Sequence, residues 1–78
     1  MKEYTVKDES GGQKWYLDGK LHREDGPAVI WADGTEEWWL NGKLHREGGP
    51  AVIWPSGAQA WWLNGNRVTE EEVMNQKS

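Results

Sequence analysis

Hydrophobic residues along this chain fall into short runs that are separated by pairs ending in glycine. Three of these pairs join Asp or Asn to Gly between apolar positions: Asp18-Gly19, Asn41-Gly42 and Asn64-Gly65. Such pairs favour type I′ hairpin turns, in which both central residues take positive φ. A second set of turns is indicated at Asp33-Gly34 and Ser56-Gly57. Strands should also be interrupted at Gly26-Pro27 and Gly49-Pro50, because proline removes a backbone donor.

The pattern predicts short antiparallel strands. Their expected ranges are 4–8, 13–18, 20–23, 27–32, 36–41, 43–46, 50–55, 59–64 and 66–68. At the end of the chain, Thr69 and Glu72 have the spacing of a helix capping box, and the first turn is acidic. A helix of about two turns is marginal alone, so Val73 and Met74 should dock on the sheet. We expect an all-β fold, a curled antiparallel meander of hairpin repeats with a short C-terminal capping helix.

The chain contains an internal repeat of 23 residues. Segments 15–37 and 38–60 are identical at 15 of 23 positions, and a partial third copy covers 61–68. Residues 1–14 read as a degenerate half-repeat, and residues 69–78 as the helix and tail. Terminal repeats of such arrays are commonly atypical. The whole is expected to form one domain.

Turn geometry fixes which residues face each other across the strands. Two-residue loops at Asn41-Gly42 and Asp33-Gly34 would pair Trp39 with Leu44 and Val29 with Trp38. They would also place Glu37 opposite Arg46 as an ion pair. Apolar side chains then lie on both faces of the sheet, with Trp31, Trp38, Trp54 and Trp61 nearer a subunit contact. We therefore expect a homo-oligomer, with a dimer favoured.

Composition narrows the classes of protein. Leu, Ile and Val together number 12, Phe is absent, and seven Trp take their place, which predicts a tryptophan core. The net charge of −4 and the lack of a basic block argue against direct nucleic acid binding. No Cys is present, and no apolar run is long enough to span a membrane. Without a recognisable signal peptide, the expected location is the cytoplasm, or the host cytoplasm if a phage encodes the chain.

The repeated unit W-x-L-N-G-K-L-H-R-E-x-G-P-A-V-x-W resembles the short hairpin repeats of MORN-repeat-variant proteins of phage and bacterial type. The resemblance covers residues 15–72 and includes the acidic segment at Thr69–Glu72. The chain departs from the better-known MORN pattern by carrying Trp where Tyr and Gly are common there. The resemblance implies a non-enzymatic binding or scaffolding module.

Two kinds of side chain are candidates for binding. The His-Arg pairs could grip a planar anion, because Arg binds phosphate or carboxylate in bidentate fashion: His22, Arg23, His45 and Arg46. Four tryptophans could form an aromatic row: Trp31, Trp38, Trp54 and Trp61. The competing interpretation is that these residues recur because the hairpin recurs, with Arg46 paired to Glu37 or Glu47 and His45 flat on Trp38. Arg23 is then the better candidate for an external contact, because Lys14 replaces Glu37 opposite it.

No catalytic residue, metal site or cofactor is expected. The serines lie at turns or at the tail, and two histidines one repeat apart are on the order of 10 Å from each other. The expected function is a non-enzymatic module, of phage or bacterial origin, that docks on and blocks a host or toxin protein. One alternative is a sponge that holds a nucleotide-like anion at a subunit seam, between Trp rings and the His-Arg pairs. A weaker alternative is a carbohydrate or choline binder.

Overall fold

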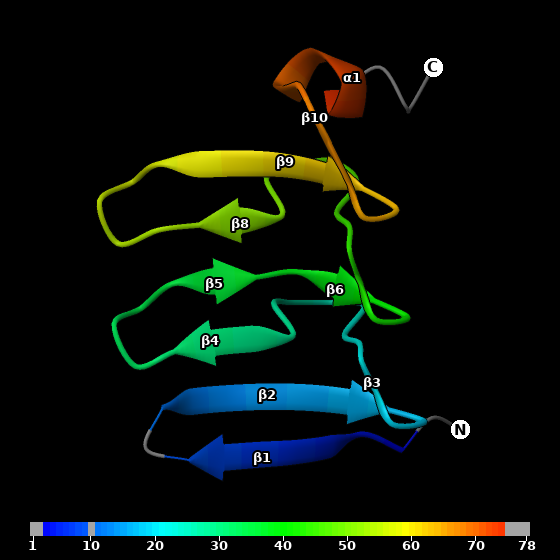
Figure 1. Cartoon of the computed structure of the whole chain (residues 1–78), viewed down its shortest axis with the longest axis vertical. Helices are drawn as coiled ribbons and strands as arrows, with labels where there is room; N and C mark the ends of the chain where they lie inside the picture. Colours follow the sequence, from blue (N-terminus) through cyan, green and yellow to red (C-terminus); the bar gives the residue numbers. More distant parts are fainter. Residues whose placement is uncertain (1–2, 10, 75–78) are drawn as a thin grey trace.

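The computed structural model describes residues 3–9 and 11–74, which form short antiparallel strands and one short helix (Figure 1). The strands are β1 (Thr5–Glu9), β2 (Gly12–Leu17), β3 (Lys20–Leu21), β4 (Val29–Trp31), β5 (Glu36–Glu37), β6 (Trp39–Leu40), β7 (Lys43–Leu44), β8 (Val52–Ile53), β9 (Gln59–Leu63) and β10 (Asn66–Val68). The helix α1 spans Glu70–Met74. The mostly β character with a C-terminal helix is as predicted. The tail at 75–78 and residues 1–2 of the half-repeat lie outside the described residues.

The strand order departs from a simple meander. The main sheet runs β1-β2-β4-β5-β8-β9-β10, β3 pairs with β2 at one side, and β6 and β7 pair with each other. After β3 and β7 the chain crosses to the next hairpin, where Arg23 N–H donates to the Trp39 carbonyl and Arg46 N–H to that of Trp62. Figure 1 shows these crossing segments at the side of the sheet where β3, β6 and β10 lie. The principal extents are 35 × 33 × 17 Å, which describe a flat slab rather than a curled surface.

The predicted Asx-Gly turns are confirmed. Asn41 has a φ of 53° and Gly42 one of 79°, and the other two pairs match them. The resulting register pairs Trp39 with Leu44 and Leu40 with Lys43, as expected. Positive φ at both central residues matches the twist of the flanking strands, which is why Asp or Asn followed by Gly is favoured there.

The turn at Asp33-Gly34 is one residue longer than expected, and the predicted register is wrong there. Trp31 N–H donates to the Thr35 carbonyl over 2.8 Å, so Ala32–Gly34 form a three-residue loop with Gly34 at a φ of 97°. Val29 consequently faces Glu37 instead of Trp38. A shift of one residue moves a side chain to the other face of a sheet.

The shifted register also corrects the predicted faces. Glu37 lies beside Trp31, and alternation along the chain places Trp38 on the opposite face, so the four candidate tryptophans do not share one face. The expected ion pair between Glu37 and Arg46 is not formed. The Glu37 carboxylate oxygens accept the indole N–H groups of Trp31 and Trp39, and the Arg46 guanidinium lies over the Trp38 ring.

Small aliphatic side chains, rather than tryptophan, form the buried core. The buried apolar residues in the described part of the chain are Ala28, Val29, Ala51, Val52, Ala60 and Val73. All seven Trp are half-buried or exposed, which contradicts the predicted tryptophan core. A slab 17 Å thick offers little depth for burying large rings, and each Trp residue remains partly accessible.

The capping box is confirmed at the start of α1. Glu72 N–H donates to Thr69 Oγ1 over 3.1 Å, and Thr69 N–H donates to Glu72 Oε1 over 3.2 Å. The helix lies against β9 and buries Val73 fully. Met74 was expected to dock as well, but it is 46% exposed.

Candidate functional site

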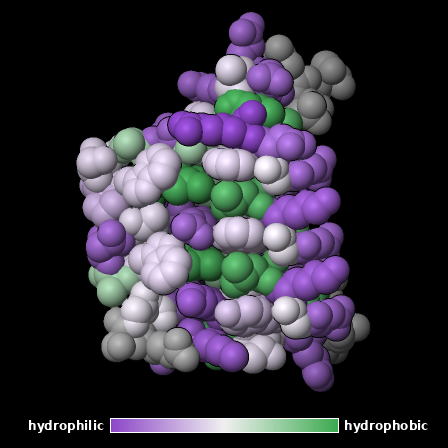
Figure 2. Space-filling model, viewed as in Figure 1, coloured by the Kyte–Doolittle hydropathy of each residue, from purple (hydrophilic) through white to green (hydrophobic). Residues whose placement is uncertain are grey.

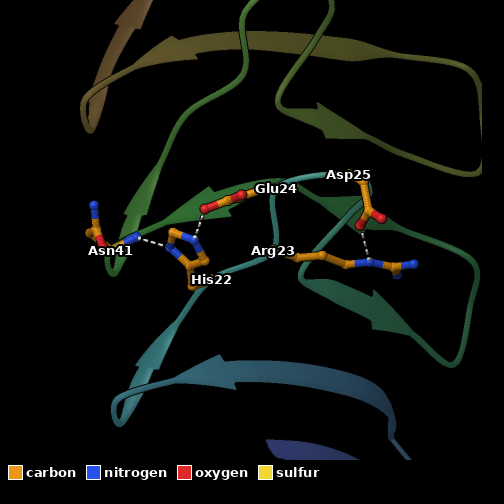
Figure 3. Close-up of polar contacts among 5 residues, drawn as sticks. All are labelled: His22, Arg23, Glu24, Asp25 and Asn41. Atoms are coloured by element: carbon orange, nitrogen blue, oxygen red, sulfur yellow. Dashed lines mark hydrogen bonds and ion pairs between the residues drawn. The ribbon is translucent and has the colours of Figure 1, made fainter. Parts of the chain in front are cut away.

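Each His-Arg pair begins with an imidazole that fastens one hairpin to the next. His22 Nδ1 accepts the backbone N–H of Asn41 over 2.9 Å, and its Nε2 contacts Glu24 Oε2 at 3.2 Å (Figure 3). His45 Nδ1 accepts the backbone N–H of Asn64 over 2.9 Å in the same way. The turn that follows 19 residues later is therefore held by the imidazole of the preceding hairpin.

Each arginine is held between a tryptophan ring and a glycine. The Arg23 guanidinium carbon lies 3.9 Å from the centroid of the Trp15 ring, and Nη1 donates to the Pro27 carbonyl over 3.3 Å. A Cβ added to Gly26 would lie 2.8 Å from that carbon. The Trp, Arg and Gly-Pro of the repeated motif thus build one stacked unit.

The second unit repeats this arrangement. Arg46 lies 3.7 Å from the Trp38 ring centroid and donates from Nη1 to the Pro50 carbonyl over 3.0 Å. A Cβ on Gly49 would lie 2.7 Å from the Arg46 guanidinium carbon. Arg46, rather than His45, therefore covers the Trp38 ring, which differs from the packing expected from the sequence.

The two arginines differ in their acidic neighbours. Arg23 Nε lies 3.3 Å from Asp25 Oδ1, whereas the residue at the equivalent position after Arg46 is Gly48. Within residues 3–9 and 11–74, Arg46 has no carboxylate at ion-pair distance. Burial lowers the pKa of the Arg46 guanidinium, and the charge of Glu36 acts in the opposite direction. Arg46 is thus the freer cation, although the sequence had pointed to Arg23.

Four of the eight candidate residues line one hollow of about 230 Å³: Arg23, Trp38, His45 and Arg46. Glu24, Leu40 and Glu47 complete its lining. The hollow lies between the two complete 23-residue units, since Arg23 and Glu24 belong to one unit and the other lining residues to the next. His22 is 5% exposed and lies outside this lining, and Trp61 is half-buried on β9.

The two remaining candidates form a separate pair. Trp31 at the end of β4 and Trp54 just after β8 are each 39% exposed. One strand, β5, lies between β4 and β8, so the two positions are about 10 Å apart at the usual strand spacing. Figure 2 shows hydrophobic and pale, intermediate side chains in rows across one face of the slab, interleaved with hydrophilic ones. We refer to Trp31 and Trp54 as the exposed Trp pair.

Glu37 is a residue whose role the sequence did not suggest. Its Oε2 accepts the indole N–H of Trp31 and its Oε1 that of Trp39, each over 3.0 Å. Ala60 stands at the equivalent position of the next unit, and the corresponding indole nitrogen of Trp62 is buried without a partner. The corrected register, which brings Glu37 beside Trp31, is the signal that could have revealed this contact.

The described residues contain no group of three or more His, Asp or Glu side chains placed to hold a metal ion. The same part of the chain has no helix long and apolar enough to cross a membrane. Comparison with family models, with curated proteins and with solved structures finds no match to this chain.

Proposed function

We propose that this chain is a non-enzymatic binding module, of phage or bacterial origin, that docks on a partner protein and blocks part of its surface. The observation that carries the proposal is the exposed Trp pair, two residues with large side chains that are each 39% exposed on neighbouring parts of the sheet. Tryptophan is enriched among the residues that dominate protein–protein binding energy.

The His-Arg pairs are occupied by contacts within the chain, which supports assigning the docking role to the exposed Trp pair. The imidazole nitrogens bond to Asn41 and Glu24 in one unit and to Asn64 and Glu47 in the next. These side chains stiffen the slab, and a stiff surface loses little conformational freedom on binding. Trp31 is itself oriented by Glu37 and has the Lys14 amine 5.0 Å above its ring.

The charge of the chain defines the partner further. A net charge of −4 favours a partner with a basic surface, because complementary fields speed association. We propose a partner that offers an apolar cleft bordered by basic groups, wide enough to take two indole rings about 10 Å apart.

The same proposal includes the finer architecture. We propose that the 23-residue unit is the structural repeat of this sheet, as in MORN-repeat-variant proteins, and that longer arrays of it would curl. The support is the recurrence of the imidazole and guanidinium contacts at a spacing of 23 residues.

A double variant, Trp31→Ala with Trp54→Ala, tests the docking proposal. Tagged wild-type protein should retain a partner from a lysate of its cellular context, and the purified partner should lose activity when the wild type is added. The double variant should lose both effects while keeping its circular dichroism spectrum. Val6→Ala, which shortens another exposed apolar side chain on β1, serves as the control. Equal capture and inhibition by the double variant would contradict the proposal.

A further inference from the structure

The hollow between the two units combines features that the docking surface does not use. It holds the Arg46 guanidinium without a carboxylate partner among the described residues, together with Arg23, His45 and two glutamates. We infer that this hollow binds a small molecule that carries one oxyanion, a phosphodiester or a carboxylate, along with N–H or O–H donors. This ligand site lies within one chain and is independent of the exposed Trp pair.

The oxyanion follows from the way Arg46 is held. A guanidinium has five N–H donors in a planar fork, and one nitrogen of Arg46, Nη1, donates to the Pro50 carbonyl. Trp38 covers one flat side of the fork, and Gly49 is close enough that a Cβ there would collide with it. The edge of the fork therefore remains for a ligand, and an edge of this shape matches a carboxylate or a phosphate.

Stacking of a base on the Trp38 ring is not the basis of recognition. The guanidinium of Arg46 already lies 3.7 Å from the centroid of that ring. The hollow measures about 230 Å³, which is smaller than the usual 300–1,000 Å³ of drug-sized pockets. It fits the charged end of a ligand or a compact molecule.

The two glutamates set the charge of the ligand. Glu24 contacts the Nε2 atom of His22 and Glu47 that of His45, at 3.2 and 3.3 Å. Two carboxylates beside the cations repel a polyanion such as a triphosphate, because like charges at short distance are unfavourable. They can, however, accept hydrogen bonds from hydroxyl or amino groups. The lining thus favours a single negative charge flanked by donors.

This set of side chains occurs in the described chain at one place, the junction between units 15–37 and 38–60. We call such a junction between consecutive complete units an inter-unit seam. Moving 23 residues forward replaces His45 and Arg46 with Val68 and Thr69. Moving back to residues 1–14 leaves a segment that contains no arginine. Two complete consecutive units are needed for the arrangement, and the sequence has two.

Titration of the isotopically labelled protein, followed by NMR of the tryptophan indole N–H groups, tests the inference. The probes are adenosine 3′,5′-cyclic monophosphate as the phosphodiester, lactate as the carboxylate, and ATP as the polyanion. Saturable shifts centred on Trp38 are expected with at least one of the first two, and that result also identifies the oxyanion class. ATP should bind at least about tenfold more weakly than the better monoanion, because Glu24 and Glu47 repel its additional negative charges.

Variants locate the site. Arg46→Gln should weaken binding at least about tenfold, the effect of losing a charged donor. Arg67→Gln removes the same charge from an exposed position on β10 and should leave binding unchanged. Gly48→Asp recreates the His-Arg-Glu-Asp-Gly-Pro loop of residues 22–27, and it should weaken binding by giving Arg46 a carboxylate. Gly48 has a φ of 89°, whereas Asp25 at the equivalent position of residues 22–27 has no positive φ. The Gly48→Asp loop should therefore adopt the backbone conformation of residues 22–27.

Several outcomes overturn the inference. Absence of saturable shifts with both monoanions would do so, as would shifts centred on Trp31 or Trp54. An equal loss of binding in Arg67→Gln would show non-specific charge attraction. If Arg46→Gln does not fold, two results decide whether the hollow is the binding site: the affinity of Gly48→Asp, and whether the wild-type shifts centre on Trp38. The Trp31→Ala and Trp54→Ala changes should leave these titrations unaltered, so failure of the docking proposal would be distinguishable.

Discussion

His22 Nδ1 accepts the backbone N–H of Asn41 over 2.9 Å, which joins two hairpins through one ring nitrogen. An imidazole that accepts at Nδ1 carries its proton on Nε2, the atom that faces Glu24. His22→Ala should lower the free energy of unfolding by about 1–3 kcal/mol, because it leaves a backbone donor without a partner. Urea denaturation gives the value.

His45→Ala is the matched variant, since His45 makes the equivalent bond to Asn64. We expect a smaller loss there, because the donor at Asn64 is exposed and water can replace the ring. A loss at His22 no larger than that at His45 would contradict this ordering.

Gly49→Ala should displace Arg46 from its stack on Trp38. The new Cβ would meet the guanidinium carbon at 2.7 Å, and the flexible side chain must move away. The expected cost is about 1–2 kcal/mol of unfolding free energy, the range for a partly desolvated cation–π contact. Thermal denaturation measures it, and Gly11→Ala is the control, because a Cβ there meets open space at a φ that is not positive, as at Gly49.

Glu37→Ala should lower the free energy of unfolding, because it removes the acceptor of the Trp39 indole N–H. Trp39 Nε1 loses its bond to Glu37, and a hydrogen bond to a charged group contributes about 1.5–3 kcal/mol. Denaturant unfolding should show a loss toward the lower end of that range, because Trp31 is exposed and its own indole can bond to water. Glu36→Ala, on the adjacent position of β5, is the control. An unchanged midpoint for Glu37→Ala would contradict the role.

Stability should depend on acid pH through Asp33. The hydrogen bond from the Thr35 backbone lowers the pKa of the Asp33 carboxyl below its ordinary value of 3.8. A lowered pKa means that the unfolded chain binds more protons, so the contribution is complete above 3.8 and is lost as pH falls through the folded value. The stability difference between wild type and Asp33→Asn should therefore shrink below pH 3.8. Ser56→Ala, in the equivalent turn, should show a difference independent of pH.

The free chain should self-associate. Val6 on the terminal strand β1 is 43% exposed, and the exposed Trp pair adds two rings on the sheet. An open strand edge and accessible apolar groups favour pairing with a second copy. Sedimentation equilibrium at micromolar concentration should report a dimer, and a 9.0 kDa monomer would contradict the expectation.

Local signals predicted the parts of the fold that depend on neighbouring residues. Asn41-Gly42 specifies its own turn through positive φ, and Thr69 and Glu72 specify the helix start through reciprocal bonds. The loop at Ala32–Gly34 was misjudged by one residue, although glycine at its third position is the signal for such a loop.

Contacts between hairpins could not be predicted from such local signals. The bond from Asn41 to His22 spans 19 residues, and the stack of Arg46 on Trp38 depends on where the chain crosses between hairpins. The predicted tryptophan core failed because burial depends on the number of layers in the fold, which local patterns do not reveal. The hollow brought together four candidate residues only because neighbouring units align.

The attachment of each hairpin to its successor determines how many ligand sites one chain can have. An inter-unit seam needs one complete unit on either side. A chain with n complete units therefore has n − 1 such seams, like the one at which Arg23 and Arg46 line the same hollow. Inserting one more copy of residues 38–60 after Ala60 should add one seam and raise the number of ligand molecules bound per chain from one to two. Stoichiometry in this architecture is thus set by chain length and could be changed without redesigning any contact.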